Sequence, residues 1–339
     1  MFKNNRSLLW AGAGLGAFLA AKTLLKKYNA YSFRNKVVIV TGGSRGLGLV
    51  LSRMLAKEGA HLAICSRTEY QLKTAAEELE QYGTEIFAVN CDLTDRLQAE
   101  SFIKQVLDRF GRIDVLINNA GIIQAGPLET MVVDDFADAM NIHFWAPLYT
   151  MLAAVPAMKA RGEGRIVNIA SVGGRISLPH IVPYSASKFA LVGLSEGFRS
   201  ELQKDGIVVT TVNPGLFRSG SVYNIKVKGQ TEKEYAWFTT LGSNLITSSS
   251  TEETARRILK ACRYGEAEVI TNFPAKFLAL SNSVLPELTA DIMALTNKYI
   301  LPAPENINQE KQGIDSDSDL IPEHLRERAA KAAEENNEL

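Results

Sequence analysis

Short apolar stretches rich in β-branched residues alternate, through the middle of the chain, with longer stretches whose apolar residues recur at helical spacing. The short stretches predict strands at residues 36–41, 61–66, 85–90, 115–118, 165–169, 208–213 and 268–271. The longer stretches predict helices at residues 46–58, 69–82, 97–110, 133–161, 183–204 and 251–264. Strands that are apolar throughout, separated by amphipathic helices, are typical of a parallel sheet covered on both faces. The pattern therefore predicts an α/β fold, with a doubly wound parallel sheet in a single domain.

Residues 216–249 interrupt this alternation between a predicted strand and a predicted helix. The interruption begins where a strand ends, and ligands bind outside the carboxyl ends of parallel strands. It is therefore placed to form a lid over an apolar substrate, although packing of its side chains on the body or on a partner subunit stays open. Its large apolar side chains are Phe217, Tyr223, Trp237, Phe238 and Leu241.

The C-terminal part of the chain departs from the pattern as well. Residues 274–301 predict one or two apolar helices broken at Pro286, so the domain at residues 35–301 ends in a helical extension. Residues 302–339 are polar, and the last 35 residues hold ten acids against four Lys and Arg. We expect this tail to be exposed, either disordered or a lone solvated helix.

The first 30 residues form a separate apolar segment. No charge occurs from Leu8 to Ala21, and residues 7–25 are about long enough to cross a bilayer if Lys22 extends its amine to the surface. The heavier positive flank is C-terminal, which would keep the rest of the chain on the cytoplasmic side. We interpret residues 1–30 as a membrane anchor, while a cleaved signal peptide and a peripheral or soluble helix remain open.

Composition narrows the classes of function. The 339 residues carry 37 Lys and Arg against 37 Asp and Glu, and 46% are hydrophobic, which is ample for a core. We expect no nucleic-acid partner, because the basic N-terminal end surrounds an apolar segment and the acidic C-terminal end would repel phosphate. The three cysteines, Cys65, Cys91 and Cys262, lack metal-binding spacing, so we expect buried thiols and no metal.

Three glycines stand where the first predicted strand meets the first predicted helix. They are Gly42, Gly46 and Gly48, in the run T-G-G-S-R-G-L-G that begins at Thr41. Glycines in such a turn let the backbone approach a dinucleotide pyrophosphate, and the following helix offers free N–H groups at its N-terminus. Because glycine is also common in ordinary tight turns, the motif needs support from a second one.

The second motif is Y-S-A-S-K, from Tyr184 to Lys188. A tyrosine and a lysine four residues apart share one face of a helix. The unperturbed pKa of tyrosine is about 10, and a nearby ammonium favours the phenolate and lowers this pKa. Such a tyrosine can give a proton to a ketone oxygen or take one from an alcohol. Ser171, at the end of an earlier predicted strand, can hydrogen-bond the same oxygen.

With these motifs, the chain resembles the short-chain dehydrogenase/reductase family over about residues 35–271. Further landmarks follow in family order: Asp92 in C-D-L, N-N-A-G from Asn118 to Gly121, Asn141 in M-N-I-H, and Pro214-Gly215. The resemblance implies a Rossmann fold and a catalytic set of Asn141, Ser171, Tyr184 and Lys188. In that set, Asn141 interrupts its helix and positions a water that relays protons through Lys188.

The same resemblance implies which residues bind the cofactor. Asp92 is expected to contact adenine, Lys188 the nicotinamide ribose, and Pro214-Gly215 to lie beside the nicotinamide. Ser219 stands where the family often has threonine, and it keeps the hydroxyl. The full predicted set is Thr41, Gly42, Ser44, Arg45, Gly46, Leu47, Gly48, Ser66, Arg67, Asp92, Leu93, Asn118, Ala120, Gly121, Tyr184, Lys188, Pro214, Gly215 and Ser219.

The end of the second predicted strand indicates which nicotinamide cofactor is used. An NAD enzyme usually has an acid there, which binds the ribose hydroxyls, whereas this strand ends at Ser66 and Arg67. Arg67 can pair with a 2′-phosphate, and the resemblance puts Arg45 at a second phosphate contact. The sequence therefore predicts NADP(H), and family analogy favours carbonyl reduction over alcohol oxidation.

Together these features predict a membrane-anchored NADP(H)-dependent oxidoreductase. Its substrate would be a small lipophilic carbonyl, or a secondary alcohol in the reverse direction, although these motifs do not identify it. The alternative is a non-catalytic, nucleotide-binding member of the family that acts as an interaction or sensor protein. Such a protein has no chemical need for Ser171, Tyr184 and Lys188 together. Homo-oligomer formation remains open.

Overall fold

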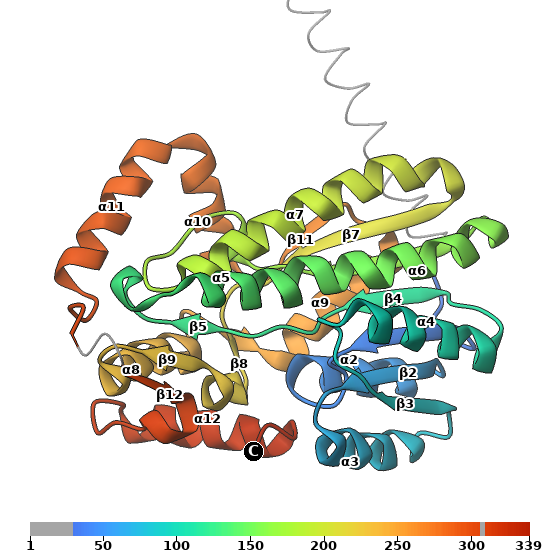
Figure 1. Cartoon of the computed structure of the whole chain (residues 1–339), viewed down its shortest axis with the longest axis horizontal. Coiled ribbons are helices and arrows are strands. Elements are labelled where there is room, and N and C mark those ends of the chain that lie inside the picture. The colour runs from blue at the N-terminus through green and yellow to red at the C-terminus, as the bar shows by residue number, and fades with distance from the viewer. Residues whose placement is uncertain (1–29, 306–308) are drawn as a thin grey trace, which may run out of the picture.

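A seven-stranded parallel sheet forms the centre of the part of the chain that the structure describes (Figure 1). The computed structural model describes residues 30–305 and 309–339. The strand order is β11, β7, β6, β4, β1, β2, β3. The bounds are β1 Val37–Thr41, β2 His61–Ser66, β3 Ile86–Asn90, β4 Val115–Asn118, β6 Gly164–Ile169, β7 Ile207–Asn213 and β11 Glu268–Ile270. The predicted doubly wound sheet is confirmed, because each predicted strand is present in it.

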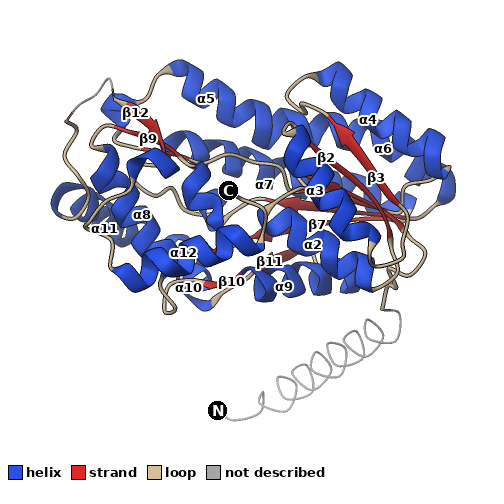
Figure 2. Ribbon diagram, turned by 90° about the horizontal axis from the view of Figure 1, so that it is seen from below, coloured by secondary structure: helices blue, strands red, loops and turns tan. Residues whose placement is uncertain are grey.

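Helices cover both faces of the sheet (Figure 2). In β1, Val38 and Val40 pack into the core on one face and Val37 and Ile39 into the core on the other, since successive side chains of a strand point to opposite faces. Helices α2, α3 and α9 contribute to the first core, and α4, α6 and α7 to the second. The bounds are α2 Gly46–Lys57, α3 Glu69–Glu80, α4 Arg96–Phe110, α6 Ala146–Arg161, α7 Val182–Leu202 and α9 Thr251–Tyr264.

Strand β1 lies between β2 and β4, so the strand order reverses at this point. In doubly wound sheets, a crevice forms outside the carboxyl ends of the strands where the order reverses. The glycine turn follows β1, and the N-N-A-G turn begins at the end of β4. The topology therefore brings both motifs to this crevice.

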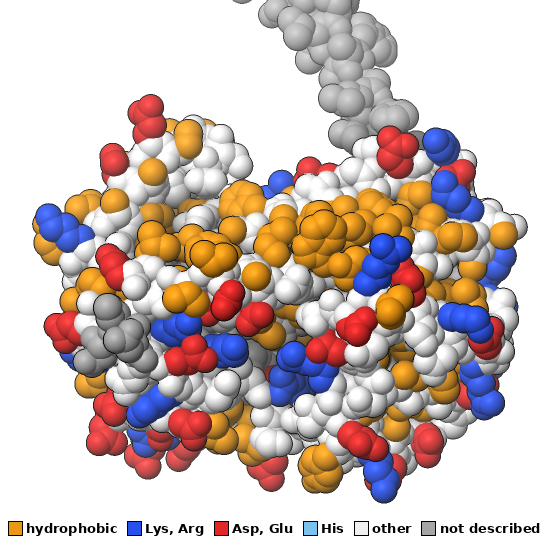
Figure 3. Space-filling model, viewed as in Figure 1, with side chains coloured by type: hydrophobic (Ala, Val, Ile, Leu, Met, Phe, Trp, Pro, Cys, Tyr) orange, Lys and Arg blue, Asp and Glu red, His pale blue; other side chains and the backbone are white. Residues whose placement is uncertain are grey.

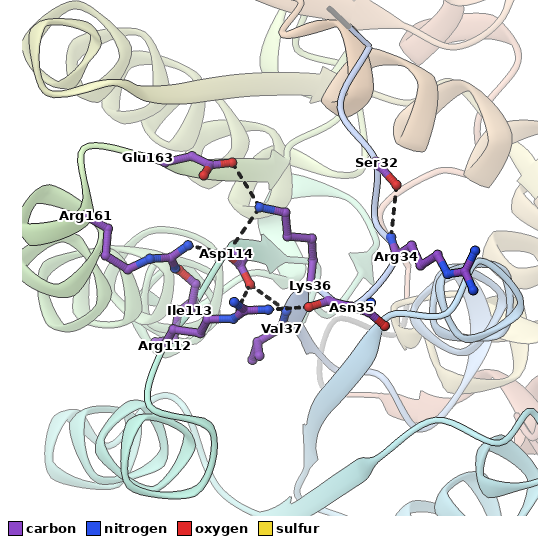
Figure 4. Close-up of polar contacts among 10 residues, drawn as sticks. All are labelled: Ser32, Arg34, Asn35, Lys36, Val37, Arg112, Ile113, Asp114, Arg161 and Glu163. Carbon is purple, nitrogen blue, oxygen red and sulfur yellow. Dashed lines mark hydrogen bonds and ion pairs between the residues drawn. The ribbon is translucent and has the colours of Figure 1, made fainter.

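At the amino-terminal ends of the strands, the buried carboxylate of Asp114 binds several segments together (Figure 4). It accepts hydrogen bonds from the backbone N–H of Val37 at 2.8 Å and from the guanidinium of Arg161 at 2.7 Å. Ion pairs with Arg112 and Lys36 measure 3.1 and 3.7 Å. A buried carboxylate is tolerated when it is paired and hydrogen-bonded in this way. Structural ion pairs thus fix the sheet at the amino-terminal ends of its strands. The carboxyl-terminal ends of the strands remain available for a ligand.

The single helix predicted at residues 133–161 is divided into three parts. They are α5 Val133–Met140, the π-helix η2 Asn141–Trp145, and α6. A π-helical segment inserts wider turns, so it changes which residues of the continuing helix face the sheet. Hydrophobic periodicity did not reveal this division, because all three parts are helical.

The insertion at residues 216–249 folds into short elements beside the carboxyl edge of the sheet. They are β8 Phe217–Arg218, η5 Gly220–Asn224, β9 Lys226–Lys228, α8 Thr231–Ser243 and β10 Ser249–Ser250. Strand β9 pairs with β5, Gln124–Ala125, which follows β4. The predicted helical extension consists of α10 Phe273–Val284 and α11 Pro286–Tyr299, so the break falls at Pro286 as expected.

The acidic tail differs from the exposed segment that we expected. It contains β12 Glu310–Gln312, the short η6 Gly313–Ser316 and α12 Glu323–Glu335. Strand β12 pairs with β9, and α12 buries Leu325, Ala329 and Ala333. These residues recur at a spacing of four, so a helix that is polar in composition still presents one apolar stripe to the body of the protein. Figure 1 shows α12 below β9 and α8.

No helix within residues 30–305 and 309–339 has the length and apolar character needed to span a bilayer. The segment interpreted as a membrane anchor, residues 7–25, lies outside the described residues. On the face drawn in Figure 3, hydrophobic side chains form a band over α5, α6 and α7. Val133, Leu152 and Phe189 of these helices are exposed.

Candidate active site

One cavity of about 970 Å³ extends along the carboxyl edge of the sheet in the described part of the chain. Its lining runs from Ser66 and Arg67 at the end of β2, past the glycine turn after β1, to Pro214 after β7 and Asn272 after β11. The cavity therefore crosses nearly the whole width of the sheet. Of the residues predicted for cofactor binding or catalysis, all but Thr41, Asn118 and Asn141 line it.

The glycine turn is shaped so that backbone approaches the cavity closely. Gly42 and Gly46 have φ angles of +62° and +53°, the left-handed region that favours glycine. A Cβ atom on Gly48 would stand 2.0 Å from the carbonyl oxygen of Gly42, so no larger residue fits there. The turn opens α2 at its N-terminus, where backbone N–H groups favour an anion. The turn thus fits a dinucleotide pyrophosphate.

Thr41 and Asn118 lie beneath this turn instead of lining the cavity. The Thr41 hydroxyl accepts hydrogen bonds from the backbone N–H groups of Asn119 and Ala120 at 2.9 and 3.1 Å. Asn118 is fully engaged with Asn168 and Thr150 at 2.8 and 2.7 Å. The two residues hold the turns in place. Asn119, which the motifs did not single out as a site residue, lines the cavity.

Two guanidinium groups, Arg45 and Arg67, line the cavity on the β2 side. Arg45 is partly buried and donates a hydrogen bond to Asn224, while Arg67 is exposed. Burial lowers the pKa of Arg45, the carboxylate of Glu338 opposes this, and the charge of Arg67 adds to the lowering. Two like charges that repel each other at a cavity wall form a favourable place for an anion such as a phosphate. Strand β2 ends at Ser66, so no acidic residue stands at this position.

Tyr184, Ser171 and Lys188 come together on the β6 and β7 side of the cavity. Tyr184 and Lys188 share one face of α7, and the Lys188 amine lies 5.6 Å from the centre of the Tyr184 ring. The same amine donates a hydrogen bond to the carbonyl of Ile169, the last residue of β6, at 2.9 Å. Ser171 caps the 3₁₀ turn η3, Val172–Gly174, by accepting from the Gly173 N–H at 3.0 Å.

Burial governs the ionisation of both groups on α7. It raises the pKa of Tyr184, and the hydrogen bond to Ser171 opposes this rise. It also lowers the pKa of Lys188 to about 7. The expected lowering of the tyrosine pKa by the lysine is therefore not what the structure gives. Tyr184 is held in its protonated form, which is the form that can donate a proton to a carbonyl.

Asn141, the fourth predicted catalytic residue, is exposed and does not line the cavity. His143, two residues further along the π-helix η2, lies in the cavity wall with its ring 5.3 Å from that of Tyr184. Residues two apart on a helix point to nearly opposite sides, so only one of them can face the site. The structure therefore separates Asn141 from the other three residues and places His143 beside them.

His143 is neutral, and its hydrogen bonds fix its tautomer. Burial and the charge of Lys188 lower its pKa well below the usual range. Its Nε2 accepts from the backbone N–H of Ile122 at 3.2 Å, so the proton is on Nδ1, which donates to Ser187 Oγ at 2.8 Å. Ser187 in turn donates to the carbonyl of Tyr184 at 2.7 Å. This chain of contacts holds the first turns of α7 against η2.

The rest of the cavity wall is mainly apolar. Trp237, Phe238 and Leu241 of α8 line it, together with Leu278 of α10 and Met293 of α11. A buried polar group supports this wall: Glu234 accepts hydrogen bonds from His180 Nδ1 at 2.8 Å and from the Trp237 indole at 2.7 Å. Four of the five apolar residues named in the insertion line the cavity, and Tyr223 packs into the core beneath it.

The fold and site define the class of protein as an oxidoreductase with a Rossmann-type nucleotide-binding sheet. The chain belongs to the short chain dehydrogenase family, whose sequence profile matches residues 36–228. Dehydrogenase/reductase SDR family member 7B of Mus musculus is 31% identical over 285 residues, which cover 83% of this chain and 87% of that protein. This membership confirms the family that the sequence motifs predicted.

Two further relatives describe the range of the family. The 11-beta-hydroxysteroid dehydrogenase-like 4A of Arabidopsis thaliana is 32% identical over 255 residues, covering 75% of this chain and 82% of that protein. L-Sorbose reductase of Gluconobacter frateurii, solved with NADPH and L-sorbose, is similar in structure with a TM-score of 0.64 and 27% identity. That match covers 72% of this chain and 98% of the reductase.

Proposed function

We propose that this protein is an NADP(H)-dependent oxidoreductase that reduces a carbonyl group on a lipophilic substrate. The observation that carries the proposal is a single cavity that joins the glycine turn and two arginines to Tyr184, Ser171 and Lys188. The relative solved with NADPH supports the choice of cofactor. The direct test is a panel of ketones of increasing size, with NADPH consumption by the purified protein as the measurement.

In this proposal Tyr184 is the general acid. Its raised pKa keeps the phenol protonated at neutral pH, so that it can donate its proton to the carbonyl oxygen. Ser171 donates a second hydrogen bond to that oxygen and orients it, which stabilises the negative charge that develops there. The bound dinucleotide supplies the hydride. Lys188 keeps one hydrogen bond to Ile169, and its remaining donors are available for hydroxyl groups of the cofactor ribose.

The cavity lining supports a lipophilic substrate. L-Sorbose reductase acts on a sugar, so the fold alone does not select apolar molecules. Here Trp237, Phe238 and Leu278 line the cavity beyond the proposed catalytic residues, and apolar walls bind apolar ligands by removing their surface from water.

A substitution in this wall tests the substrate class. Trp237→Ala should lower kcat/KM for long-chain or polycyclic ketones more than for a small ketone, because only the larger substrates reach the indole. Trp145→Ala, a change of the same type outside the cavity, serves as the control. Equal losses for all ketone sizes would favour a packing role for Trp237 and remove the support for a lipophilic substrate.

We also propose that residues 7–25 anchor the protein in a membrane, with the enzyme domain on the cytoplasmic side. The support is the uncharged stretch from Leu8 to Ala21 and its basic flanks. Full-length protein should stay in the membrane fraction through a high-salt wash, because salt weakens electrostatic but not hydrophobic attachment. A variant that lacks residues 1–30 should be released and keep its activity. Full-length protein in the supernatant would contradict the proposal.

Homo-oligomer formation stays a prediction, which light scattering would test.

A further inference from the structure

Residues 336–339 lie against the part of the cavity that fits the pyrophosphate, and Glu338 lines it. After α12, the carbonyl oxygen of Asn336 accepts a hydrogen bond from the backbone N–H of Gly46 at 2.9 Å. The Asn336 side chain also accepts one from Arg53 of α2 at 3.0 Å. Gly46 is the first residue of α2, so the tail uses a backbone donor at the N-terminus of this helix.

Asn337 turns the chain toward the cavity. Its φ angle is +55°, a left-handed conformation that asparagine tolerates better than most residues. Its side-chain amide donates to the carbonyls of Ser44 and Gln71 at 2.9 and 3.0 Å, and its own carbonyl accepts from the Gln71 side chain at 3.2 Å. These paired contacts tie the tail to both the glycine turn and α3.

Glu338 places a carboxylate between the glycine turn and the segment after β7. One carboxylate oxygen accepts from the backbone N–H of Gly220 at 2.6 Å, and the other lies 2.9 Å from the place of a Cβ atom on Gly46. The residue is buried, and its backbone carbonyl accepts from the Asn224 side chain at 3.1 Å. The carboxyl group of Glu338 is thus seated between two segments that the proposed function assigns to the cofactor.

We infer that residues 336–339 are an internal ligand of the cofactor site, which competes with the dinucleotide pyrophosphate and must leave before the cofactor binds. The inference rests on the proposed function, since it takes this cavity to be the dinucleotide site. The Gly46 N–H cannot donate to the tail and to a phosphate oxygen at once, and the Glu338 carboxyl group, when ionised, would repel a phosphate beside it.

Residues 336–339 can leave the cofactor site while the domain stays folded. Helix α12 stays anchored by Leu325, Ala329 and Ala333, and the release concerns only the residues after Glu335. Leu339 is 62% exposed, so burial of its side chain does not hold residues 336–339 in place. Burial raises the pKa of Glu338 to about 7, while the Gly220 N–H and the charge of Arg45 oppose the rise, so this carboxyl group is only partly ionised at neutral pH. A short tether keeps the tail near its site at high effective concentration.

The inference is tested by titrating three variants with NADPH, following the NADPH fluorescence and comparing each Kd with that of the wild-type protein. Deletion of residues 336–339 should tighten the NADPH Kd by about tenfold if the tail is docked in roughly nine of ten molecules. Glu338→Ala should shift the Kd in the same direction by less, because the Asn336 and Asn337 contacts remain. Glu335→Ala, which removes an exposed acid of the same tail, should leave the Kd at the wild-type value.

The outcomes separate this inference from the proposed function. An NADPH Kd that is unchanged or weaker after deletion, with an unchanged melting temperature, would overturn the inference and leave the cofactor assignment standing. If the deletion variant does not fold, the Glu338→Ala result decides in the same way. A complete lack of NADPH binding by every variant would instead refute the proposed function, and the inference would fall with it.

Discussion

Tyr184→Phe is expected to reduce ketone turnover by about a thousandfold while leaving NADPH affinity nearly unchanged, because general acid catalysis contributes roughly 10²–10⁴ to such rates. The substitution removes the phenolic proton donor and keeps the ring, which packs edge-on against His143 at 5.3 Å. The measurements are kcat from NADPH consumption and Kd from NADPH fluorescence. The pair of values separates a chemical role of the hydroxyl from a role in binding.

Tyr70→Phe is the matched control, since Tyr70 is exposed and lies outside the cavity. It should leave both values at the wild-type level. A kcat for Tyr184→Phe within about tenfold of wild type would refute the proposed mechanism, because so small a loss is less than a positioned general acid contributes. Wild-type protein that binds NADPH but turns over no ketone would favour the non-catalytic alternative.

Arg67→Ala is expected to raise the KM for NADPH by about tenfold or more, with little effect on the KM for NADH. A hydrogen bond to a charged group is worth roughly 1.5–3 kcal/mol, and about 1.4 kcal/mol corresponds to a factor of ten. Only NADPH carries the 2′-phosphate that Arg67 is proposed to contact. Because Arg67 is exposed, solvent screening favours the lower end of this range.

Arg256→Ala controls for a general loss of positive charge, as Arg256 is exposed on α9 and does not line the cavity. It should change neither KM. If Arg67→Ala changes the KM values for NADPH and NADH equally, Arg67 does not contact the 2′-phosphate of NADPH. The choice of NADP(H) would then rest on Arg45 and on the missing acid after β2.

Much of the fold was determined locally, and so the sequence alone predicted it. The central strands of the sheet are buried on both faces, so each appears as a short run of apolar residues, as in Val37–Thr41. In each covering helix the buried apolar residues recur at regular spacing along the sequence, as Ala255, Ile258 and Cys262 do in α9. The glycine turn and Y-S-A-S-K could also be recognised, because their chemistry needs fixed residue types at fixed short spacing.

The catalytic set shows where local pattern stops being sufficient. Asn141 and His143 both lie in a stretch of helical periodicity, and periodicity does not say which of two polar residues faces a cavity. The π-helix η2 decides this by altering the phase between α5 and α6. A polar histidine in an apolar stretch of a buried helix was the one signal that could have pointed to His143.

The sequence by itself determined the sheet, its order of motifs and the family, because burial and turn chemistry are encoded within a few neighbouring residues. Only the tertiary structure decided what the C-terminal tail does. Its composition resembles that of a solvated segment, and its contacts join Glu338 to Gly220 and Asn336 to Gly46, residues far apart in the chain. Contacts of that range depend on how the whole domain folds, and a local pattern of polar and apolar residues does not record them.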